Sequence, residues 1–466
     1  MNYQVPQHIN KDKIFIVNRS TIDNRLDAQY YSADLDLSGF VKLSSVAIVK
    51  GGKRIPKGYG YSNEQTPYHY LRVADMDSNA QVEVNNLMNI SEEVFNILER
   101  YEILEGELAI SIAGTIGKTT ILKNIPIDKR VILTENCAKV LAKTNVDLLP
   151  EYLKICLELP IVKKQLDLNY IQTTIPKLGL DKIVGIKIPP IPCIQKQQEI
   201  VDYINEAYIQ KRVKEVESQQ LLDSIDGYLL KELGITIPSV DDGLKNRIFL
   251  SSFSKIEGNR IDPKYNKQIR YFQESYDSNT WKTLSSVSIV KGQYGANEAA
   301  IAYQEGDTRY IRITDIDEIG NLKNEDKKTA QHIDDMYLLH NGDILFARSG
   351  SVGKCYLHRD KKPSIFAGYL IRFVLNDKII LPKFLFYYCN SSLYWYWVDT
   401  IHRPAVQANI NAEEYCKMPI PVPSINKQQE IVNYIADIRT RAKALQTEGK
   451  AILEDAKRKV EEMIIK

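Results

Sequence analysis

The stretch ELAISIAGTIGKTTIL, residues 107–122, comes nearest of any in this chain to a nucleotide-binding motif. A P-loop needs a glycine, four further residues and then Gly-Lys-Ser/Thr, so that a long turn can wrap its amides around phosphate. The required glycine would stand at position 112, which is Ile112, and Gly114 lies too close to Gly117 to form that wrap. The spacing therefore argues against ATP binding.

Other catalytic or metal-binding patterns are also missing. The histidines show no metal-ligand spacing, and the cysteines form no CxxC pair, which argues against a zinc ribbon or a disulfide framework and favours a reducing cytoplasm. Pro189-Pro190 is flanked by isoleucines, unlike the Asn/Asp-Pro-Pro-aromatic tetrad of an adenine methyltransferase. Glu325-Asp326-Lys327 resembles the end of a nuclease Glu-x-Lys motif, but the first half of the chain has no counterpart to it. We therefore expect a non-catalytic binding protein without a metal or cofactor of its own.

The bulk composition is that of an ordinary globular protein. The 466 residues are 44% hydrophobic and 26% charged, which suggests two to four domains. No run approaches the ~18 apolar residues of a membrane span, and the first residues lack a secretion signal, so we expect a cytoplasmic protein. The net charge of +2 leaves open whether the chain binds nucleic acid.

The sequence contains an internal duplication. Five segments recur in the same order: residues 25–31 at 260–266, 43–51 at 284–292, 70–77 at 310–317, 106–118 at 342–354, and 195–204 at 426–435. Chance does not produce five collinear matches, so the protein contains two copies of one unit of about 230 residues. The second copy of the glycine-lysine stretch reads SGSVGKCYL, with Cys355 where a P-loop would place Thr119. Both copies keep Gly-x-x-Gly-Lys between apolar runs, which predicts a strand-turn-strand unit.

Each copy combines a β-rich part with helices. Alternating β-branched and aromatic runs predict strands, and a helix candidate follows Pro150 and Pro382. Proline-rich straps at residues 186–194 and 418–425 precede long helical patterns, Gln197–Leu233 and Gln428–Ile464. A seam with a 4-3 spacing runs through Ile431, Ile435, Ile438, Ala442, Leu445, Gly449, Ile452, Ala456, Val460 and Met463. The first helix is less regular, with Val201, Ile204, Tyr208, Val213, Val216, Leu222, Ile225 and Leu229.

We predict that the two helices pack antiparallel as a rod of about 50 Å; the alternative is two separate helices, each lying on its own domain. The predicted fold class is α+β, with two homologous β-rich domains separated by a two-helix coiled coil and related by a pseudo-two-fold. The predicted domains are residues 1–194, 236–424 for the two globular parts and 195–235, 425–466 for the helices.

These features together resemble the specificity subunit of Type I restriction-modification systems. The resemblance covers essentially the whole chain and rests on the straps with their helix starts (Ile188–Ile204, Ile420–Ile435), on Gln-x-x-Ile (Gln172/Ile175, Gln407/Ile410) and on the paired Gly-x-x-Gly-Lys turns. It implies two target-recognition domains, each reading one half of a split, asymmetric DNA sequence. KQQE stands where many members carry an acidic EEQ, so the resemblance does not assign the exact subunit-docking residues of this chain.

The resemblance also implies partners. The helices would act as a molecular ruler and as the docking surface for two methyltransferase subunits, which would bind S-adenosylmethionine, and restriction subunits would join the complex. Double-stranded DNA is the expected ligand, and no membrane is involved. Two alternatives stay open: a related system whose partner fuses methyltransferase and nuclease, and a coiled-coil scaffold that does not bind DNA.

Three groups of residues are candidates for DNA contact because cations suit phosphate, while Arg, Lys, Asn, Gln, Ser and Thr suit base edges. The first group is Lys50, Lys53, Arg54 and Lys57 in the first copy and Lys291, Gln293, Tyr294 and Asn297 in the second. The second is Thr115, Lys118 and Thr119, with Arg348, Ser349, Ser351 and Lys354. The third is Tyr170, Thr173, Thr174 and Lys177, with His402, Arg403 and Asn409.

The bland alternatives to these contacts are a solvated lysine loop and turn-capping residues. Gln172 and Gln407 occur in both copies and are expected to serve architecture. Arg72 and Arg312 stand three residues before Asp75 and Asp315, which favours a salt bridge within each domain. The cluster YWYW at residues 394–397 is expected to be core in preference to a stacking platform for bases.

Overall fold

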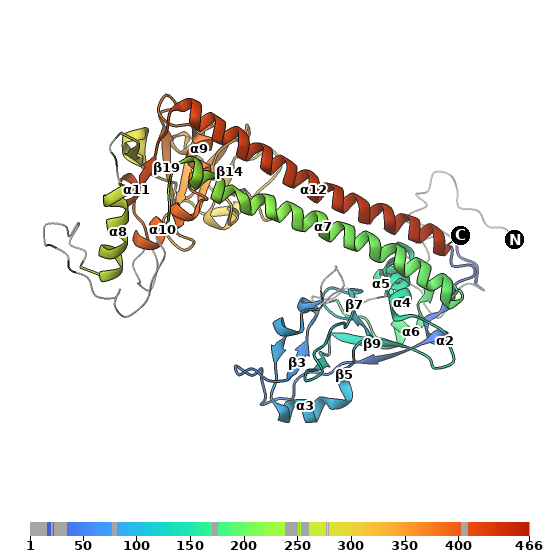
Figure 1. Cartoon of the computed structure of the whole chain (residues 1–466). Helices are drawn as coiled ribbons and strands as arrows, with labels where there is room; N and C mark the ends of the chain where they lie inside the picture. The colour runs from blue at the N-terminus through green and yellow to red at the C-terminus, as the bar shows by residue number, and fades with distance from the viewer. Residues whose placement is uncertain are drawn as a thin grey trace. The chain divides into compact units, whose positions relative to one another are not determined.

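The computed structural model describes residues 16–19, 22, 35–76, 82–169, 176–237, 250, 252, 261–275, 277, 279–401 and 409–465. The chain divides into two compact units, residues 1–213 with 448–466 (unit 1) and residues 214–447 (unit 2). Each unit contains one β-rich domain and half of each of two long helices, so the predicted α+β fold with duplicated domains is confirmed (Figure 1).

Unit 1 is built on two four-stranded sheets, ordered β2-β9-β6-β7 and β4-β3-β8-β5, and a small β1-β10 ladder. Its strands are β1 (Val41–Lys42), β2 (Ala47–Gly51), β3 (Tyr68–Leu71), β4 (Met88–Asn89), β5 (Glu102–Ile103), β6 (Leu108–Ser111), β7 (Thr119–Ile121), β8 (Arg130–Leu133), β9 (Cys137–Ala142) and β10 (Lys187–Ile188). Its helices are α2 (Leu43–Val46), α3 (Glu92–Leu98), α4 (Pro150–Glu158), α5 (Pro160–Asn169) and α6 (Leu180–Gly185), with 3-10 turns at Val73–Asp75, Val84–Asn86 and Glu99–Tyr101. The main core joins the first sheet to α4 and α5.

Unit 2 repeats the first of these sheets with the order β12-β19-β16-β17. Its strands are β11 (Trp281–Thr283), β12 (Ser288–Tyr294), β13 (Ala300–Ala302), β14 (Arg309–Ile311), β15 (Lys328–Ala330), β16 (Ile344–Ala347), β17 (Cys355–Leu357), β18 (Ser364–Phe366), β19 (Leu370–Leu375) and β20 (Pro419–Pro421). Its helices are α8 (Pro263–Ser275), α9 (Pro382–Tyr388), α10 (Ser392–Ile401) and α11 (Ala412–Cys416), with 3-10 turns at Leu284–Val287, Ile313–Asp315 and Asp335–Tyr337. The parallel pairing of β14 with β18 repeats that of β3 with β8.

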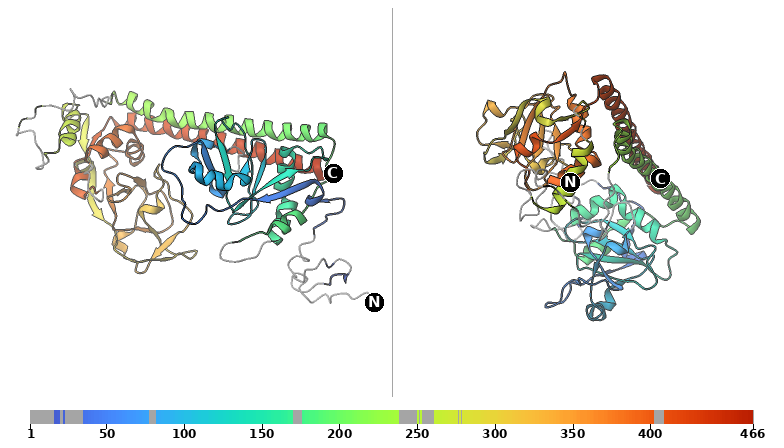
Figure 2. Two further views of the ribbon diagram at one scale, coloured as in Figure 1. Left: turned by 90° about the horizontal axis from the view of Figure 1, so that it is seen from below. Right: turned by 60° about the vertical axis from the view of Figure 1, so that its left-hand side comes forward.

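The long helices α7 (Ile194–Glu232) and α12 (Ile425–Ile465) are each uninterrupted, and each is about 60 Å long at about 1.5 Å per residue. In unit 1 the first turns of α7 share one core with the last turns of α12, through Ile204 and Val460 among others. In unit 2 the ring of Tyr228 stacks on that of Tyr434 at 3.9 Å between centroids, and Ser218 Oγ donates to the carbonyl of Ala442 at 3.0 Å. The antiparallel pairing is therefore confirmed, and the alternative of two separate helices is wrong (Figure 2).

The seam between these helices differs from the predicted one in detail. Val213 and Val216 of α7 are each 48% exposed, whereas Ser218 is fully buried. Near the end of α12 the buried residue is Ile464, not the predicted Met463, which is 37% exposed. A helix with 3.6 residues per turn drifts relative to a strict 3.5-residue repeat, so the contact line moves by one position along a long helix.

A buried glutamine fixes the start of each long helix, a role that was not predicted from the sequence. In unit 1, Gln197 Nε2 donates to the carbonyls of Asp147 and Pro192, both at 2.8 Å, and its Oε1 accepts from the amide of Leu149 at 2.9 Å. Gln428 repeats the pattern in unit 2, with the carbonyls of Ile379 (3.0 Å) and Pro423 (2.8 Å) and the amide of Leu381 (2.8 Å). Both side chains are fully buried, so each ties a strap, a long helix and the first turn of α4 or α9 together.

A cation–π contact also joins each long helix to its own domain, with the two partners exchanged between the copies. In unit 1, Lys154 of α4 lies 5.9 Å from the ring centre of Tyr208 on α7. At the equivalent positions in unit 2, Arg439 of α12 lies 5.7 Å from the ring centre of Phe386 on α9. The contact is therefore kept although both residues have changed, which indicates that the helix-to-domain geometry is the same in both units.

The hydrogen bonds of Gln428 predict that substitutions at two neighbouring positions change the free energy of unfolding by very different amounts. Gln428→Ala leaves the amide of Leu381 and two carbonyls without their partner, so the free energy of unfolding of unit 2 should fall by about 2–4 kcal/mol. The exposed Gln429, whose side chain donates a hydrogen bond to Asn433 one turn along the helix, is the matched control, and Gln429→Ala should change this free energy by less than about 0.5 kcal/mol. Urea unfolding followed by circular dichroism measures both. Equal destabilisation by the two variants would contradict the role of Gln428.

Candidate nucleic-acid interface

Each Gly-x-x-Gly-Lys turn closes an antiparallel hairpin, β6 with β7 in unit 1 and β16 with β17 in unit 2. The predicted strand-turn-strand unit is thus confirmed, and a strand stands where a P-loop requires a helix. The glycines are needed because Gly114 and Gly117 have φ of +74° and +78°, and their counterparts Gly350 and Gly353 have +69° and +89°.

The lysine that follows each turn points into its own domain. Lys118 Nζ donates to the carbonyl of Met76 at 3.0 Å. Lys354 Nζ makes the equivalent contact with the carbonyl of Ile316 at 3.4 Å and pairs with Glu318 at 2.6 Å, and the residue is 8% exposed. In this structure both ammonium groups stabilise the turn from inside, and their contact with DNA stays a prediction.

The hydroxyl residues of the turns divide into exposed and buried ones. Thr115 and Ser351 lie exposed at the tips of the turns. Thr119 is 4% exposed, and its Oγ1 donates to Glu158 at 2.6 Å. In this structure the Thr119 hydroxyl is therefore engaged inside unit 1, and its predicted contact with DNA stays a prediction.

One backbone frame recurs beside the turn in both units. In unit 1 the amide of Ile112 donates to the carbonyl of Asn136 at 2.7 Å, and the amide of Leu178 donates to the carbonyl of Ile112 at 2.8 Å. A β-bridge joins Ala113 to Lys177. The frame thus brings the second predicted group, in the turn, together with the third, in the segment before α6.

Unit 2 builds the same frame from other residues. The amide of Arg348 donates to the carbonyl of Tyr369 at 3.0 Å, and the amide of Ile410 donates to the carbonyl of Arg348 at 2.9 Å. A β-bridge joins Ser349 to Asn409. Because these contacts use only the backbone, they leave the side chains free to differ.

We call the side chains carried by this frame the platform. It consists of Ala113, Asn136 and Lys177 in unit 1 and of Ser349, Tyr369 and Asn409 in unit 2. At none of the three matched positions do the two units carry the same residue type. Tyr369, which is 63% exposed, was missed in the sequence because its counterpart Asn136 carries no aromatic ring and the match between them depends on the hydrogen bonds.

The platform of unit 2 continues into the first predicted group. The guanidinium of Arg348 lies 4.9 Å from the ring centre of Tyr294, which is 40% exposed. The Tyr294 hydroxyl accepts from the amide of Ala412 at 3.2 Å, which fixes the ring on α11. Gln293 is instead held inside the unit, since its side chain accepts from Arg372 and donates to the carbonyl of Met336 at 3.2 Å.

The basic loop of unit 1 lies over the ends of β3 and β8. Lys53, Arg54 and Lys57 are exposed, and Arg54 pairs with Glu135 at 2.6 Å. Burial raises the pKa of Glu135, but hydrogen bonds from Arg54 and Thr134 outweigh this and lower the pKa, so the carboxylate stays charged and orients the guanidinium. The Tyr70 hydroxyl donates to the carbonyl of Lys53 at 2.7 Å and holds the loop from below.

The matching of this loop between the copies differs from the sequence-based expectation. Lys53 donates its amide to Leu133 at 3.0 Å, and Ala296 donates its amide to Phe366 at 2.8 Å, at equivalent points of the parallel strands. Asn297 therefore corresponds to Arg54. Gln293 and Tyr294 belong to the longer, bulged strand β12 and have no counterpart in unit 1. The bulge could not be foreseen because it adds residues without changing the local pattern.

The remaining sequence expectations fall into two sets. Arg72 pairs with Asp75, and Arg312 with Asp315, both at 2.7 Å, so the predicted salt bridges are confirmed. In the YWYW cluster Tyr394 and Trp397 are buried, which confirms a core role for these two rings. Lys50, Lys291 and Asn297 are exposed on or beside their strands. Outside the described residues lie the following: Tyr170, Gln172, Thr173, Thr174, His402, Arg403 and Gln407.

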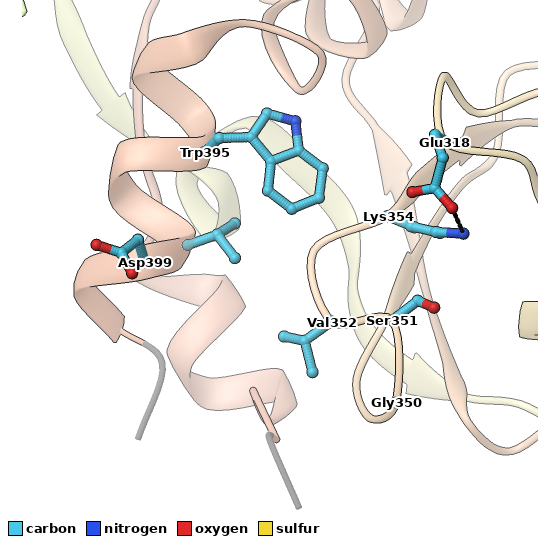
Figure 3. A pocket seen from close by; sticks show the side chains of 8 residues that line it. Glu318, Gly350, Ser351, Val352, Lys354, Trp395 and Asp399 are labelled. Atoms are coloured by element: carbon cyan, nitrogen blue, oxygen red, sulfur yellow. Dashed lines mark hydrogen bonds and ion pairs between the residues drawn. The ribbon is translucent and has the colours of Figure 1, made fainter. Parts of the chain in front are cut away.

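A cavity of about 410 Å³ lies beside the turn of unit 2 (Figure 3). The indole of Trp395 on α10 faces it, and the ion pair of Lys354 with Glu318 forms part of its wall. At the position of Trp395 unit 1 carries Lys163, because α5 and α10 begin 232 residues apart. The two units thus differ beside their turns as well as on their platforms.

Membrane-spanning helices and metal-binding clusters were sought among the described residues. Among the helices of the described residues, none is both long and apolar enough to cross a membrane. The described part of the chain contains no cluster of three His, Cys, Asp or Glu side chains arranged to hold a metal ion.

Comparisons with known proteins point in one direction. The model of the Type I restriction modification DNA specificity domain matches residues 37–221 and again residues 280–454. The Type I restriction enzyme EcoBI specificity subunit of Escherichia coli is 24% identical over 173 residues, an alignment that spans only 36% of this chain and 36% of that one.

One solved structure has the same fold, and two others align over most of the chain with lower TM-scores. A chain from a study of complex assembly and conformational transition of the type I R-M system is 13% identical, with 91% of this chain and 96% of that chain aligned and a TM-score of 0.52. The S subunit from M. genitalium (12% identical, 91% and 95% aligned) gives a TM-score of 0.39. The HsdS subunit from Thermoanaerobacter tengcongensis (14% identical, 92% and 96% aligned) gives 0.36.

The basic loop of unit 1 packs so closely on the strand end that position 52 requires a glycine. A Cβ at this position would lie 2.1 Å from the carbonyl oxygen of Thr134 and 2.4 Å from that of Leu133. Gly52→Ala should therefore lower the free energy of unfolding of unit 1 by about 1–3 kcal/mol, because the loop must lift off the strand end. Gly60 lies in the same loop with open space around it, so Gly60→Ala should change it by less than about 0.5 kcal/mol. Thermal unfolding compares the two variants. A free energy of unfolding that Gly52→Ala leaves unchanged would contradict this packing of the loop.

Proposed function

Because the chain belongs to the family of Type I restriction-modification DNA specificity proteins, we propose that it reads a split, asymmetric DNA target, one half-site by each unit. The observation that carries the proposal is the duplicated platform. The same backbone frame presents Ala113, Asn136 and Lys177 in one unit and Ser349, Tyr369 and Asn409 in the other. A protein that read two identical half-sites would need no such difference.

The chemistry of the exposed side chains supports base reading in unit 2 and backbone contact in unit 1. Asn409 can form a bidentate pair with an adenine edge, and Arg348 can do so with guanine if it leaves the ring of Tyr294. Lys53 and Lys57 lie exposed in a glycine-containing loop and suit phosphate oxygens. Arg54 would exchange its contact with Glu135 for phosphate on binding.

The long helices would set the distance between the half-sites. Each of α7 and α12 runs without interruption through residues of both units, and their antiparallel contact repeats in each unit. A length of about 60 Å exceeds one turn of B-DNA, which is about 34–36 Å. The helices would therefore act as a ruler for a target whose two parts are separated by unread base pairs.

The chain would act without an active site of its own. Adenine methylation and DNA cleavage would be supplied by partners: two methyltransferase subunits that bind S-adenosylmethionine, and restriction subunits. No cofactor is proposed for this chain. All six cysteines are free, which supports the cytoplasm as the working compartment.

The experiment that tests this function is methylation mapping in a host that expresses the chain with its neighbouring methyltransferase. The wild-type chain should direct methylation to one bipartite sequence. Asn409→Ala should relax a single position of one half-site, at a cost of about 1–3 kcal/mol in binding, and leave the other half-site and the spacer unchanged. Asn341→Ala, which changes an exposed asparagine in another turn, is the matched control and should leave the target as it is.

Two results would count against the proposal, and a third would identify a related system. A continuous, unsplit methylated sequence would exclude two separated readers. If the complex does not bind DNA, or binds it with an affinity that does not depend on salt, the scaffold alternative is favoured. Contacts to phosphate release counterions, so a complex that binds DNA through them should bind more weakly as salt rises. Methylation by a partner that carries its own nuclease would leave target reading intact and identify the related system with a fused partner.

A further inference from the structure

The two copies serve as a comparison of homologues within one chain. Residues 43–51 and 284–292 agree at eight of nine positions, LSSVAIVKG against LSSVSIVKG, although most of the surrounding surface has changed. Each segment forms a short helical turn and then an edge strand, β2 or β12, of its four-stranded sheet. Identity at a position is expected where the fold requires it, or where both copies bind the same thing.

The fold accounts for most of these identities. Leu43 and Leu284 are fully buried. Ser45 and Ser286 each donate to the carbonyl three residues earlier, at 2.6 and 2.7 Å. At Gly292 a Cβ would lie 2.9 Å from the Cβ of Ala412. These residues are shared because the turn and the strand cannot pack without them.

Two shared positions have no such explanation. Ile48 is 45% exposed and its counterpart Ile289 is 67% exposed. Lys50 and Lys291 are also exposed, and neither ammonium group makes a hydrogen bond or salt bridge with another described residue. In the regular strand β2, Ile48 and Lys50 are two residues apart and share one face. In β12 the register shifts on both sides of Val290, but Ile289 and Lys291 are again exposed on either side of one half-buried valine. We call this pair, repeated in both units, the Ile-Lys face.

We propose that the Ile-Lys face is a protein-docking surface, and that each unit uses it to bind one copy of the same methyltransferase partner. This inference rests on the proposed function. Base-reading residues must differ between two half-sites, as the platform residues do, whereas a partner that binds twice requires the same contacts twice. Each unit keeps these contacts at the surface, on a strand that has only one neighbouring strand in its sheet.

The chemistry of the face defines the partner surface. An exposed isoleucine offers apolar contact area, which phosphate cannot use, so a protein fits better than the DNA backbone. The adjacent lysine calls for a carboxylate. We therefore infer an apolar patch on the partner, bordered by an aspartate or glutamate that pairs with Lys50 in one unit and with Lys291 in the other.

The experiment introduces a carboxylate at the centre of each face in the full-length chain. Ile48→Glu and Ile289→Glu are made singly and together, and native mass spectrometry and titration count the methyltransferase subunits that bind. Each single variant should keep one partner at wild-type affinity and bind the second at least about tenfold more weakly. The double variant should bind both weakly, while the DNA affinity of the chain alone stays unchanged.

The matched controls are Ile127→Glu and Ile301→Glu, which alter exposed isoleucines without a twin in the other copy. Both should retain two partners. Ile48→Thr and Ile289→Thr, which keep a β-branched side chain, separate lost contact from lost folding and should weaken binding with an unchanged unfolding midpoint.

Other outcomes overturn the inference in recognisable ways. Two partners bound with unchanged affinity by the double variant would remove the face as a docking site. Weakened DNA binding with normal partner binding would make it a phosphate contact. Self-association of the wild type that the variants abolish would make it an interface between copies of this chain. Within this experiment, a wild-type chain that binds neither partner nor DNA would count against the proposed function itself.

Discussion

A fully buried glutamine at the start of each long helix is the constraint on which the rest of this architecture depends. Gln197 and Gln428 each make three hydrogen bonds that join a strap, a long helix and the first turn of α4 or α9. A buried amide that lost these partners would cost about 1–3 kcal/mol per group, so the geometry has one strongly preferred form. The exchanged cation–π pairs, Lys154 with Tyr208 and Arg439 with Phe386, support the same geometry from a second side.

Constancy and variation occupy different parts of each unit. The backbone frame beside the Gly-x-x-Gly-Lys turn is the same in both, because its hydrogen bonds need no particular side chain. The side chains that the frame carries have diverged completely, from Lys177 to Asn409 at one position and from Asn136 to Tyr369 at another. Under the proposed function, such a protein could change its target without changing its fold, since reading and folding would depend on different atoms.

Much of this organisation was predictable from the sequence, because repetition supplied an internal control. Comparison of the two copies argued against a P-loop at Lys118. The spacing of Arg72 and Asp75 predicted their salt bridge. The sequence did not predict features that depend on contacts with distant chain segments. The inward direction of Lys354 depends on the carbonyl of Ile316, and the insertion of Gln293 depends on a bulge against β19. A sequence pattern shows which residues are basic or polar, but the partner that engages them is set by tertiary packing.

The central claim is that one frame reads two sequences because it carries two sets of side chains. Transferring the platform of unit 1 to unit 2, by Ser349→Ala, Tyr369→Asn and Asn409→Lys together, tests it most directly. Methylation mapping of the triple variant should show that the second half-site has changed while the first half-site and the spacer length are retained. A target identical to that of the wild type, or one altered in both half-sites, would contradict the account.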